Sequence, residues 1–306
     1  MQAMRHDTDS GGPALSALGL GEVGAASVIF GMTIVFAKLV PVPAWAIIEG
    51  RAFFGALALL LLGLALGRPP ALPGSGARAR LALAGLGLSA ALQWTCLFTA
   101  AQVSSVALAI LVFSAHPIVV ALVEAAMRRQ RPAPVQFWLA GLVLAGTAVL
   151  VPGERAAGQP VLGAALALLA SGAHAAGILI KKHGLRATHT SLSMAFWEHA
   201  QACVLLSPLL LIAPGRLWEP STLALLALLG TAFSALPRFL VTDSLRTLPA
   251  WVTSLVITTE PIPAALFAAL LVGEVPGWNT ALGGGLILSA VCWEILGRRS
   301  PAGPVR

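Results

Sequence analysis

Ten apolar runs, each long enough to cross a bilayer as a helix, occupy most of the chain. A membrane-spanning helix needs about 20 mostly apolar residues, because each residue rises about 1.5 Å through a hydrocarbon core of about 30 Å. Only 10% of the residues are charged, whereas a soluble domain needs roughly 25% to solvate its surface. We therefore expect an all-α integral membrane protein with ten transmembrane helices. The predicted spans are 21–40, 42–66, 79–99, 104–127, 133–152, 158–181, 190–213, 220–245, 249–273 and 277–297.

Lysine and arginine residues gather in alternate loops between these spans. With a cytoplasmic N-terminus, 14 of them lie inside and only 3 outside, namely Lys38, Arg155 and Arg216. Because basic loops stay in the cytoplasm, we expect a multi-pass plasma membrane protein, in a bacterium the inner membrane. Residues 1–19 and 298–306 are then cytoplasmic tails. No signal-peptide pattern precedes the first span, so we expect it to be retained.

A repeat with an offset of 144 residues divides the spans into two sets of five. Pro117 and Pro261 differ by this offset, and so do Pro132 and Pro276, and Gly141 and Gly285. The predicted halves are residues 20–153 and 154–297. Because five is odd, the second half must enter the membrane in the opposite direction to the first. Inverted repeats of this kind are a transporter architecture that suits alternating access.

Three segments resemble those of a known transporter superfamily. TTEPIPAALFAALLVGE (258–274) resembles the ninth-span element of the drug/metabolite transporters, in particular their ten-helix EamA-type members. SAHPIVVALVEAAMRRQ (114–130) is its counterpart in the first half, with Gln130 in place of the glutamate. FTAAQVSSVALAI (98–110) resembles the family's tight turn of small residues. Within the superfamily the chain looks most like the YddG-type exporters, which are associated with aromatic amino acids and with some cationic or amphipathic compounds.

Two polar residues precede prolines in the middle of predicted spans. His116 and Glu260 are 144 residues apart, and each is followed by a proline. A proline removes a helical hydrogen bond and frees a carbonyl. One interpretation is that these residues satisfy the loosened backbone. The other is that they line a central cavity and bind the charged end of a substrate.

Five further residues complete the predicted substrate site: Gln93, Trp94, Ser171, His174 and Trp197. Trp94 and Trp197 lie deeper in their spans than the other tryptophans. They are predicted to form an aromatic wall that stacks on a ring or a cation, the alternative being that they fill gaps between helices. Ser171 and His174 share one helix face and are predicted to contact the same cavity.

Three charged residues inside the spans are predicted to act in gating or coupling: Glu49, Arg51 and Glu198. A charge at mid-bilayer costs at least about 2.5–3.5 kcal/mol unless it is paired or hydrated. Glu49 and Glu198 each lie about seven residues into the second span of their half, so an inverted repeat would place them near opposite faces. The alternative is that both are packing carboxylates. Arg51 faces away from Glu49 and needs either an acid from another helix or the carboxylate of a substrate.

The predicted function is a secondary transporter that exports small organic metabolites, including aromatic amino acids, by alternating access. Export of drugs or organic cations is the alternative, and an intramembrane enzyme has less support because no G-x-S-x-G or H-E-x-x-H motif occurs. We expect no catalytic residues, no metal, no cofactor and no obligatory protein partner. The expected partners are the lipid bilayer and an amino acid or amphipathic metabolite. A nucleic-acid partner is not expected, because the net charge of +7 is explained by the cytoplasmic loops.

Overall fold

The structure is a computed structural model that describes residues 16–71, 76–127, 129, 134–153, 158–181, 190–244, 248, 256–257 and 259–297. These residues form helices and the turns that connect them. The α-helices are α1 (Ala17–Leu39), α2 (Ala44–Ala65), α3 (Ala77–Val103), α4 (Val106–Phe113), α5 (His116–Met127), α6 (Pro134–Gly153), α7 (Pro160–Ile180), α8 (Ser191–Leu206), α9 (Pro220–Gly230), α10 (Leu236–Ser244), α12 (Pro261–Val272) and α13 (Trp278–Gly297). Two 3₁₀ segments, η3 (Ser207–Ile212) and η4 (Gly215–Trp218), and one π-helical turn, η5 (Thr231–Ala235), complete the set.

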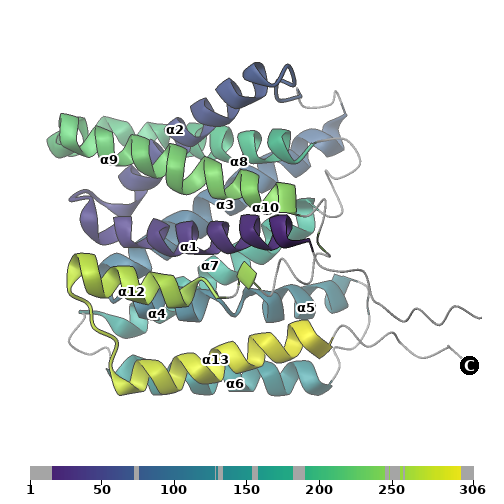
Figure 1. Cartoon of the computed structure of the whole chain (residues 1–306), viewed down its shortest axis with the longest axis vertical. Helices are drawn as coiled ribbons and strands as arrows, with labels where there is room; N and C mark the ends of the chain where they lie inside the picture. Colours follow the sequence, from purple (N-terminus) through teal and green to yellow (C-terminus); the bar gives the residue numbers. More distant parts are fainter. Residues whose placement is uncertain are drawn as a thin grey trace, which may run out of the picture.

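The helices lie side by side in one bundle, with their axes running across the view of Figure 1. The most extensive packing is of α3 against α7 and α8, α2 against α8 and α9, α1 against α10 and α12, and α6 against α13. Every one of these pairs joins a helix from the first half of the chain to one from the second. The two halves therefore interlock in a single core rather than forming separate lobes.

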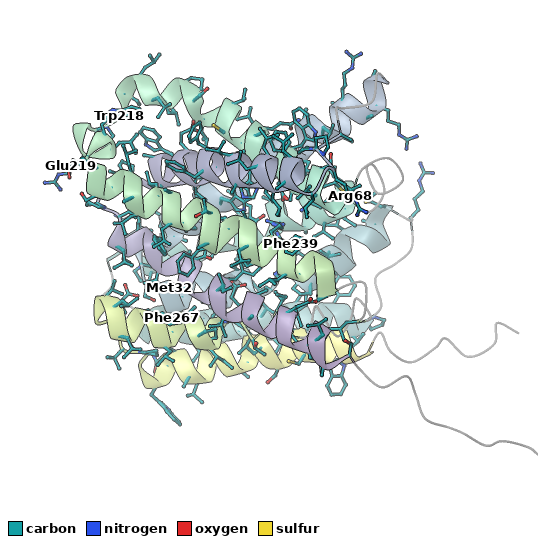
Figure 2. The ribbon with its side chains drawn as sticks, turned by 45° about the horizontal axis from the view of Figure 1, so that its top comes forward. Met32, Arg68, Trp218, Glu219, Phe239 and Phe267 are labelled. Carbon is teal, nitrogen blue, oxygen red and sulfur yellow. The ribbon has the colours of Figure 1, made fainter. Side chains whose placement is uncertain are left out.

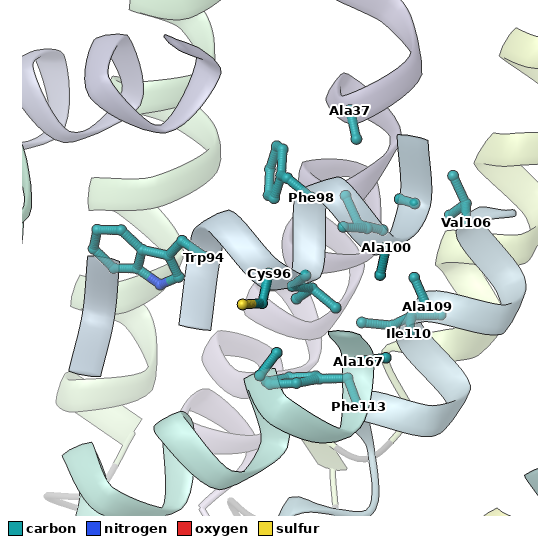
Figure 3. Close-up of a cluster of buried hydrophobic side chains, with 14 of the residues drawn as sticks. Ala37, Trp94, Cys96, Phe98, Ala100, Val106, Ala109, Ile110, Phe113 and Ala167 are labelled. Carbon is teal, nitrogen blue, oxygen red and sulfur yellow. The ribbon is translucent and has the colours of Figure 1, made fainter. Parts of the chain in front are cut away.

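Small residues bring the helices of this core close together. Figure 3 shows α3, α4 and α7 meeting through Cys96, Ala100, Ile110 and Ala167, with the ring of Phe113 among them. In lipid there is little hydrophobic force between helices, so close van der Waals contact between small residues stabilises their association. The alanines and glycines of this sequence thus have a direct packing role.

Polar contacts at one end of the bundle show that α1 and α7 run in opposite directions. Lys38, in the last turn of α1, donates from Nζ to the carbonyl of Ser104 at 2.7 Å. Gln159, directly before α7, donates its backbone N–H to the carbonyl of Val103 at 2.7 Å. The end of α1 and the start of α7 therefore meet at the same turn, between α3 and α4.

Four predicted spans differ from the straight helices expected of them. The span at 104–127 consists of α4 and α5, and the one at 190–213 ends in η3. The span at 220–245 contains the π-helical turn η5, and in 249–273 the described helix α12 begins only at its proline. Each departure lies at or close to a proline: Pro117, Pro208, Pro237 and Pro261. A proline has no N–H to donate, so the regular hydrogen-bond ladder is interrupted there.

The sides of the bundle are apolar. Within the part of the chain that the structure describes, six helical segments are long and apolar enough to cross a membrane: Ala17–Leu39, Ala44–Ala65, Ala77–Val103, Pro160–Ile180, Leu192–Ile212 and Pro220–Val241. Large apolar side chains such as Trp138, Leu211 and Val275 are exposed. In Figure 2, Arg68 and Glu219 lie at opposite ends of the bundle, while Met32 and Phe267 lie together where α1 meets α12. A surface of this kind suits lipid tails along the sides and water at the ends.

Helices α9 and α2 approach each other closely at Gly230. An added Cβ would lie 2.6 Å from Cβ of Phe54 and 2.9 Å from the backbone oxygen of Arg51. Because a backbone cannot move aside cheaply, Gly230→Ala should destabilise the protein by about 1–3 kcal/mol. The measurement is the thermal unfolding midpoint of purified protein in detergent. Gly141→Ala, where nothing lies within 4 Å, is the control and should leave the midpoint unchanged; an equal midpoint in both variants would contradict this packing.

Candidate functional site

The break between α4 and α5 places unpaired backbone groups inside the bundle. Pro117 cannot donate to the carbonyl of Phe113, four residues earlier, which a continuous helix would require. Ser171, on α7, donates instead, with its Oγ 2.8 Å from the Phe113 oxygen and 3.4 Å from the Val112 oxygen. Ser171 itself is completely buried. Its hydroxyl therefore replaces the missing helical donor and fastens α7 to the break.

One turn further along α7, His174 joins a cluster of polar rings. His174 and His116 lie edge to face with ring centroids 4.6 Å apart, and both contact the ring of Phe113. His174 also has Nδ1 2.9 Å from Oε1 of Gln93 on α3, a hydrogen bond in which the amide oxygen accepts. The structure thus brings four of the predicted residues together, namely Gln93, His116, Ser171 and His174.

Trp94, the neighbour of Gln93, lies against the guanidinium of Arg51 on α2. The Cζ of Arg51 is 4.5 Å from the Trp94 ring centroid and 5.7 Å from that of Phe98. Trp94 is only 1% exposed, so it holds the arginine rather than presenting a free face to a substrate. The cation predicted to stack on Trp94 is therefore one that the protein supplies itself.

Arg51 has no acidic partner in the part of the chain that the structure describes. Its Nε donates to Oγ of Ser234, in the π-helical turn η5, at 2.6 Å. Among the described carboxylates none lies within 4.0 Å of its guanidinium. The side chain is nonetheless 95% covered, being 5% exposed. Of the two partners that the sequence suggested, an acid on a neighbouring helix is thus not found.

His199, on α8, also packs against Trp94, with ring centroids 4.8 Å apart and the two rings tilted. Its Nδ1 donates to the carbonyl of Ala195 at 2.8 Å. The Nε2 of His199 and the Nε1 of Trp94 are both buried and have no hydrogen-bond partner among the described residues. Arg51, Trp94 and His199 thus pack together, and each of them has a polar nitrogen atom without a hydrogen-bond partner among the described residues.

Glu260 stands directly before α12, as His116 stands at the start of α5. Its backbone carbonyl accepts from Ala264, but its carboxylate has no hydrogen bond or ion pair with any described residue. The repeat-related residues His116 and Glu260 thus both lie at helix breaks, with a ring cluster at one and a free carboxylate at the other.

Glu198 forms ion pairs with two cationic side chains. Lys181 Nζ lies 2.9 Å from Oε1 and 2.8 Å from Oε2, and Arg238 Nη1 lies 3.4 Å from Oε2. These contacts join the end of α7 to α8 and α10. Glu198 is thus paired within the protein, and its role in gating or coupling stays a prediction.

Glu49, on α2, contacts α8 beyond Glu198. Its Oε1 accepts from the thiol of Cys203 at 3.2 Å, while its Oε2 is buried without a partner among the described residues. Cys203 is only five residues beyond Glu198 on α8, a rise of about 7.5 Å. Because α2 and α8 pack directly against each other, the two glutamates lie on neighbouring helices at different depths, and their placement near opposite faces stays a prediction.

The polar residues described above form what we call the polar layer: Arg51, Gln93, Trp94, His116, Ser171, His174, His199, Ser234 and Glu260. Trp197 lies apart from this layer. Its Nε1 donates to the carbonyl of Ala71, after α2, at 2.8 Å. Its ring packs beside Leu83 and Leu86, in a different cluster from Trp94. Because Trp197 and His199 are two residues apart on one helix, they point to different sides. The predicted wall of Trp94 and Trp197 does not form.

Two members of the layer, His199 and Ser234, were not predicted. His199 adjoins Glu198 and points to a different side of the helix, and Ser234 resembles any small residue of a transmembrane helix. The nearby Pro237 was the available signal, since an interrupted helix offers polar groups to its neighbours. Among the described residues, no three His, Cys, Asp or Glu side chains gather in a way that could hold a metal ion.

The sequence matches the model of the EamA-like transporter family twice, over residues 19–151 and 161–295. The chain belongs to the EamA-like transporter family. Both matches together span most of the protein, so it is a multi-pass membrane transporter built from two copies of one family unit. The buried polar layer contains residues of both copies, with Arg51, Gln93, Trp94 and His116 from the first and Ser171, His174, His199, Ser234 and Glu260 from the second.

A solved crystal structure shares the fold of this EamA-like protein. It aligns with a TM-score of 0.64 over 94% of this chain and 100% of the other, at 17% sequence identity. At that identity the likeness concerns the fold alone. No curated protein matches the sequence.

Ser171 provides a test of the contact that anchors the layer. Ser171→Ala would remove the shorter of two contacts to the Phe113 carbonyl and leave His116 Nδ1 at 3.3 Å, so stability should fall by about 1 kcal/mol. The thermal unfolding midpoint in detergent measures this loss. The control is Ser289→Ala, which removes an exposed hydroxyl that bonds only within its own helix and should change the midpoint little. Equal midpoints in the two variants would contradict the anchoring role.

Proposed function

We propose that this protein is a secondary transporter that exports small organic metabolites, including aromatic amino acids, from the cytoplasm. The observation that carries the proposal is the polar layer at the helix breaks, to which both family units contribute. Broken helices at mid-membrane, with polar groups between two repeats, are where transporters bind their substrates. The YddG-type exporters remain the subfamily that the sequence resembles most.

The proposed topology is ten transmembrane helices in two inverted repeats, with both termini in the cytoplasm of a bacterial inner membrane. The opposite directions of α1 and α7, which begin the two units, support the inversion. The unequal distribution of Lys and Arg between alternate loops supports the orientation. On this view the end of the bundle that holds Lys38 faces the outside.

Alternating access requires a contact that closes one end and can be released. Lys38 and Glu274 form such a contact, with Nζ 3.1 Å from Oε1. Glu274 Oε2 also accepts from the backbone N–H of Val106, at 2.8 Å. The ion pair thus links α1 of the first unit to the end of α12 in the second, across the start of α4.

The Lys38–Glu274 pair should hold the outer end closed. Glu274→Gln is therefore expected to raise the rate at which a membrane-impermeant maleimide labels a cysteine placed at Ala37, in a background with Cys96, Cys203 and Cys292 replaced by alanine. Glu219→Gln removes an exposed carboxylate at the same end and is the matched control, with no expected change. Exchanging the charges, Lys38→Glu with Glu274→Lys, should return labelling toward its original rate. Equal labelling rates in Glu274→Gln and Glu219→Gln would rule out a role for the Lys38–Glu274 ion pair in closing the outer end.

Export of drugs or organic cations is the second candidate, and the free carboxylate of Glu260 favours it. Such a group would attract a cation whether or not the cation also carries a carboxylate. Proton coupling, exchange and facilitated movement are all compatible with the geometry described above.

Counterflow in proteoliposomes tests the export proposal. Liposomes loaded with unlabelled phenylalanine should accumulate labelled phenylalanine, tryptophan or another amino acid, and the recovered label should be chemically unchanged. Protein-free liposomes provide the control. Accumulation of organic cations without any amino acid would favour the second candidate, and recovery of a converted product would contradict a transport function.

A further inference from the structure

Arg51 has no ion pair with any described residue. A guanidinium has five N–H donors, and among the described residues only its Nε–H is donated, to Ser234. The rings of Trp94 and Phe98 stabilise the cation through their faces, but they accept no in-plane hydrogen bonds. The planar edge of an arginine is the group that binds a carboxylate with two parallel bonds.

Glu260 has the opposite charge and is equally unmatched. Its carboxylate has no hydrogen bond or ion pair with a described residue. An isolated charge inside a membrane protein is costly, and the usual reason for keeping one is a functional partner that is not part of the resting structure. Lys181 with Glu198, and Lys38 with Glu274, are by contrast paired within the protein. Glu49, which is also buried without an ion pair, at least accepts a hydrogen bond from the Cys203 thiol.

Helix α1 contacts the residue beside Ser234, which is the partner of Arg51, and the residue beside Glu260. Thr33, on α1, donates to the carbonyl of Phe233, the neighbour of Ser234, at 2.7 Å. Ser27, also on α1, has its Oγ 3.1 Å from Oγ1 of Thr259, the neighbour of Glu260. Ser27 and Thr33 are six residues apart, a rise of about 9 Å. The residue beside Ser234 and the residue beside Glu260 thus contact helix α1 nearly two turns apart.

We infer that Arg51 and Glu260 bind the two charged groups of an α-amino acid, with the guanidinium taking the carboxylate and Glu260 taking the ammonium. This assignment rests on the proposed export function and sharpens it, because a plain organic cation would meet the unpaired charge of Arg51. An amino acid brings a negative and a positive group a few bonds apart, which matches two opposite charges that do not pair with each other. Trp94, being fully covered, is a positioning residue that holds the guanidinium.

The test compares three ligands of one size: phenylalanine, phenethylamine, which lacks the carboxylate, and 3-phenylpropionate, which lacks the ammonium. Binding to the purified full-length protein in nanodiscs is measured by calorimetry, and transport by counterflow. The native protein should bind phenylalanine about 10- to 100-fold more tightly than either analogue, the range expected for one charge-assisted contact.

Arg51→Gln should abolish the preference for phenylalanine over phenethylamine. Glu260→Gln should abolish the preference over 3-phenylpropionate, and it provides a second, independent route if Arg51→Gln does not fold. Arg51→Lys should restore part of the carboxylate preference, because it keeps the charge but not the planar edge. Arg238→Gln removes another covered guanidinium, one that pairs with Glu198, and should leave the ligand ratios unchanged even if stability falls.

Two results would overturn the assignment in different ways. If the native protein transports phenylalanine but Arg51→Gln weakens phenylalanine and phenethylamine by the same factor, the carboxylate site is wrong and export stands. If the native protein transports and binds phenethylamine but no amino acid, the proposed substrate class fails, and the amino acid site fails with it.

Discussion

A backbone carbonyl that is released in the middle of a bilayer must find a donor within the protein, because lipid tails offer none. The prolines of this chain create several such carbonyls at places where a straight helix would have none. At Pro117 the donor is Ser171, and this bond fixes α7 against the junction of α4 and α5. Once α7 is held there, its next turn sets His174 between His116 and Gln93. The polar layer therefore follows from a backbone requirement.

Buried charges obey the same constraint, and the protein meets it in two ways. Lys38 with Glu274, and Lys181 with Glu198, form ion pairs that also join helices or turns. Lys38 and Lys181 stand at the ends of α1 and α7, the first helices of the two family units. Arg51, Glu49 and Glu260 have no ion pair with a described residue. Glu49 accepts a hydrogen bond from the Cys203 thiol, whereas the Glu260 carboxylate has no hydrogen bond with a described residue and Arg51 donates only to Ser234. A structural ion pair and an open charge differ in role: the first holds elements together, and the second can bind a ligand.

Much of the architecture could be predicted because it depends on short stretches of sequence. The positions of the apolar runs, the prolines and the family motif are local properties, and the helices and the family match follow them closely. The sequence could also predict that Gln93, His116, Ser171 and His174 lie together. These residues are polar, lie within apolar runs and cluster around a proline, and in lipid such residues have to face one another.

The sequence by itself determined that the chain folds as apolar helices interrupted at prolines, with two related units, because hydrophobicity and hydrogen-bond loss act within a few residues. Only the tertiary structure decided which charges pair. Whether Arg51 meets a glutamate or Ser234, and whether Trp94 meets Trp197 or His199, depends on how far each helix is rotated and where helices cross. Those quantities come from contacts between residues more than a hundred positions apart. A change of one residue in helix phase turns a side chain by about 100°, which is enough to exchange its partner.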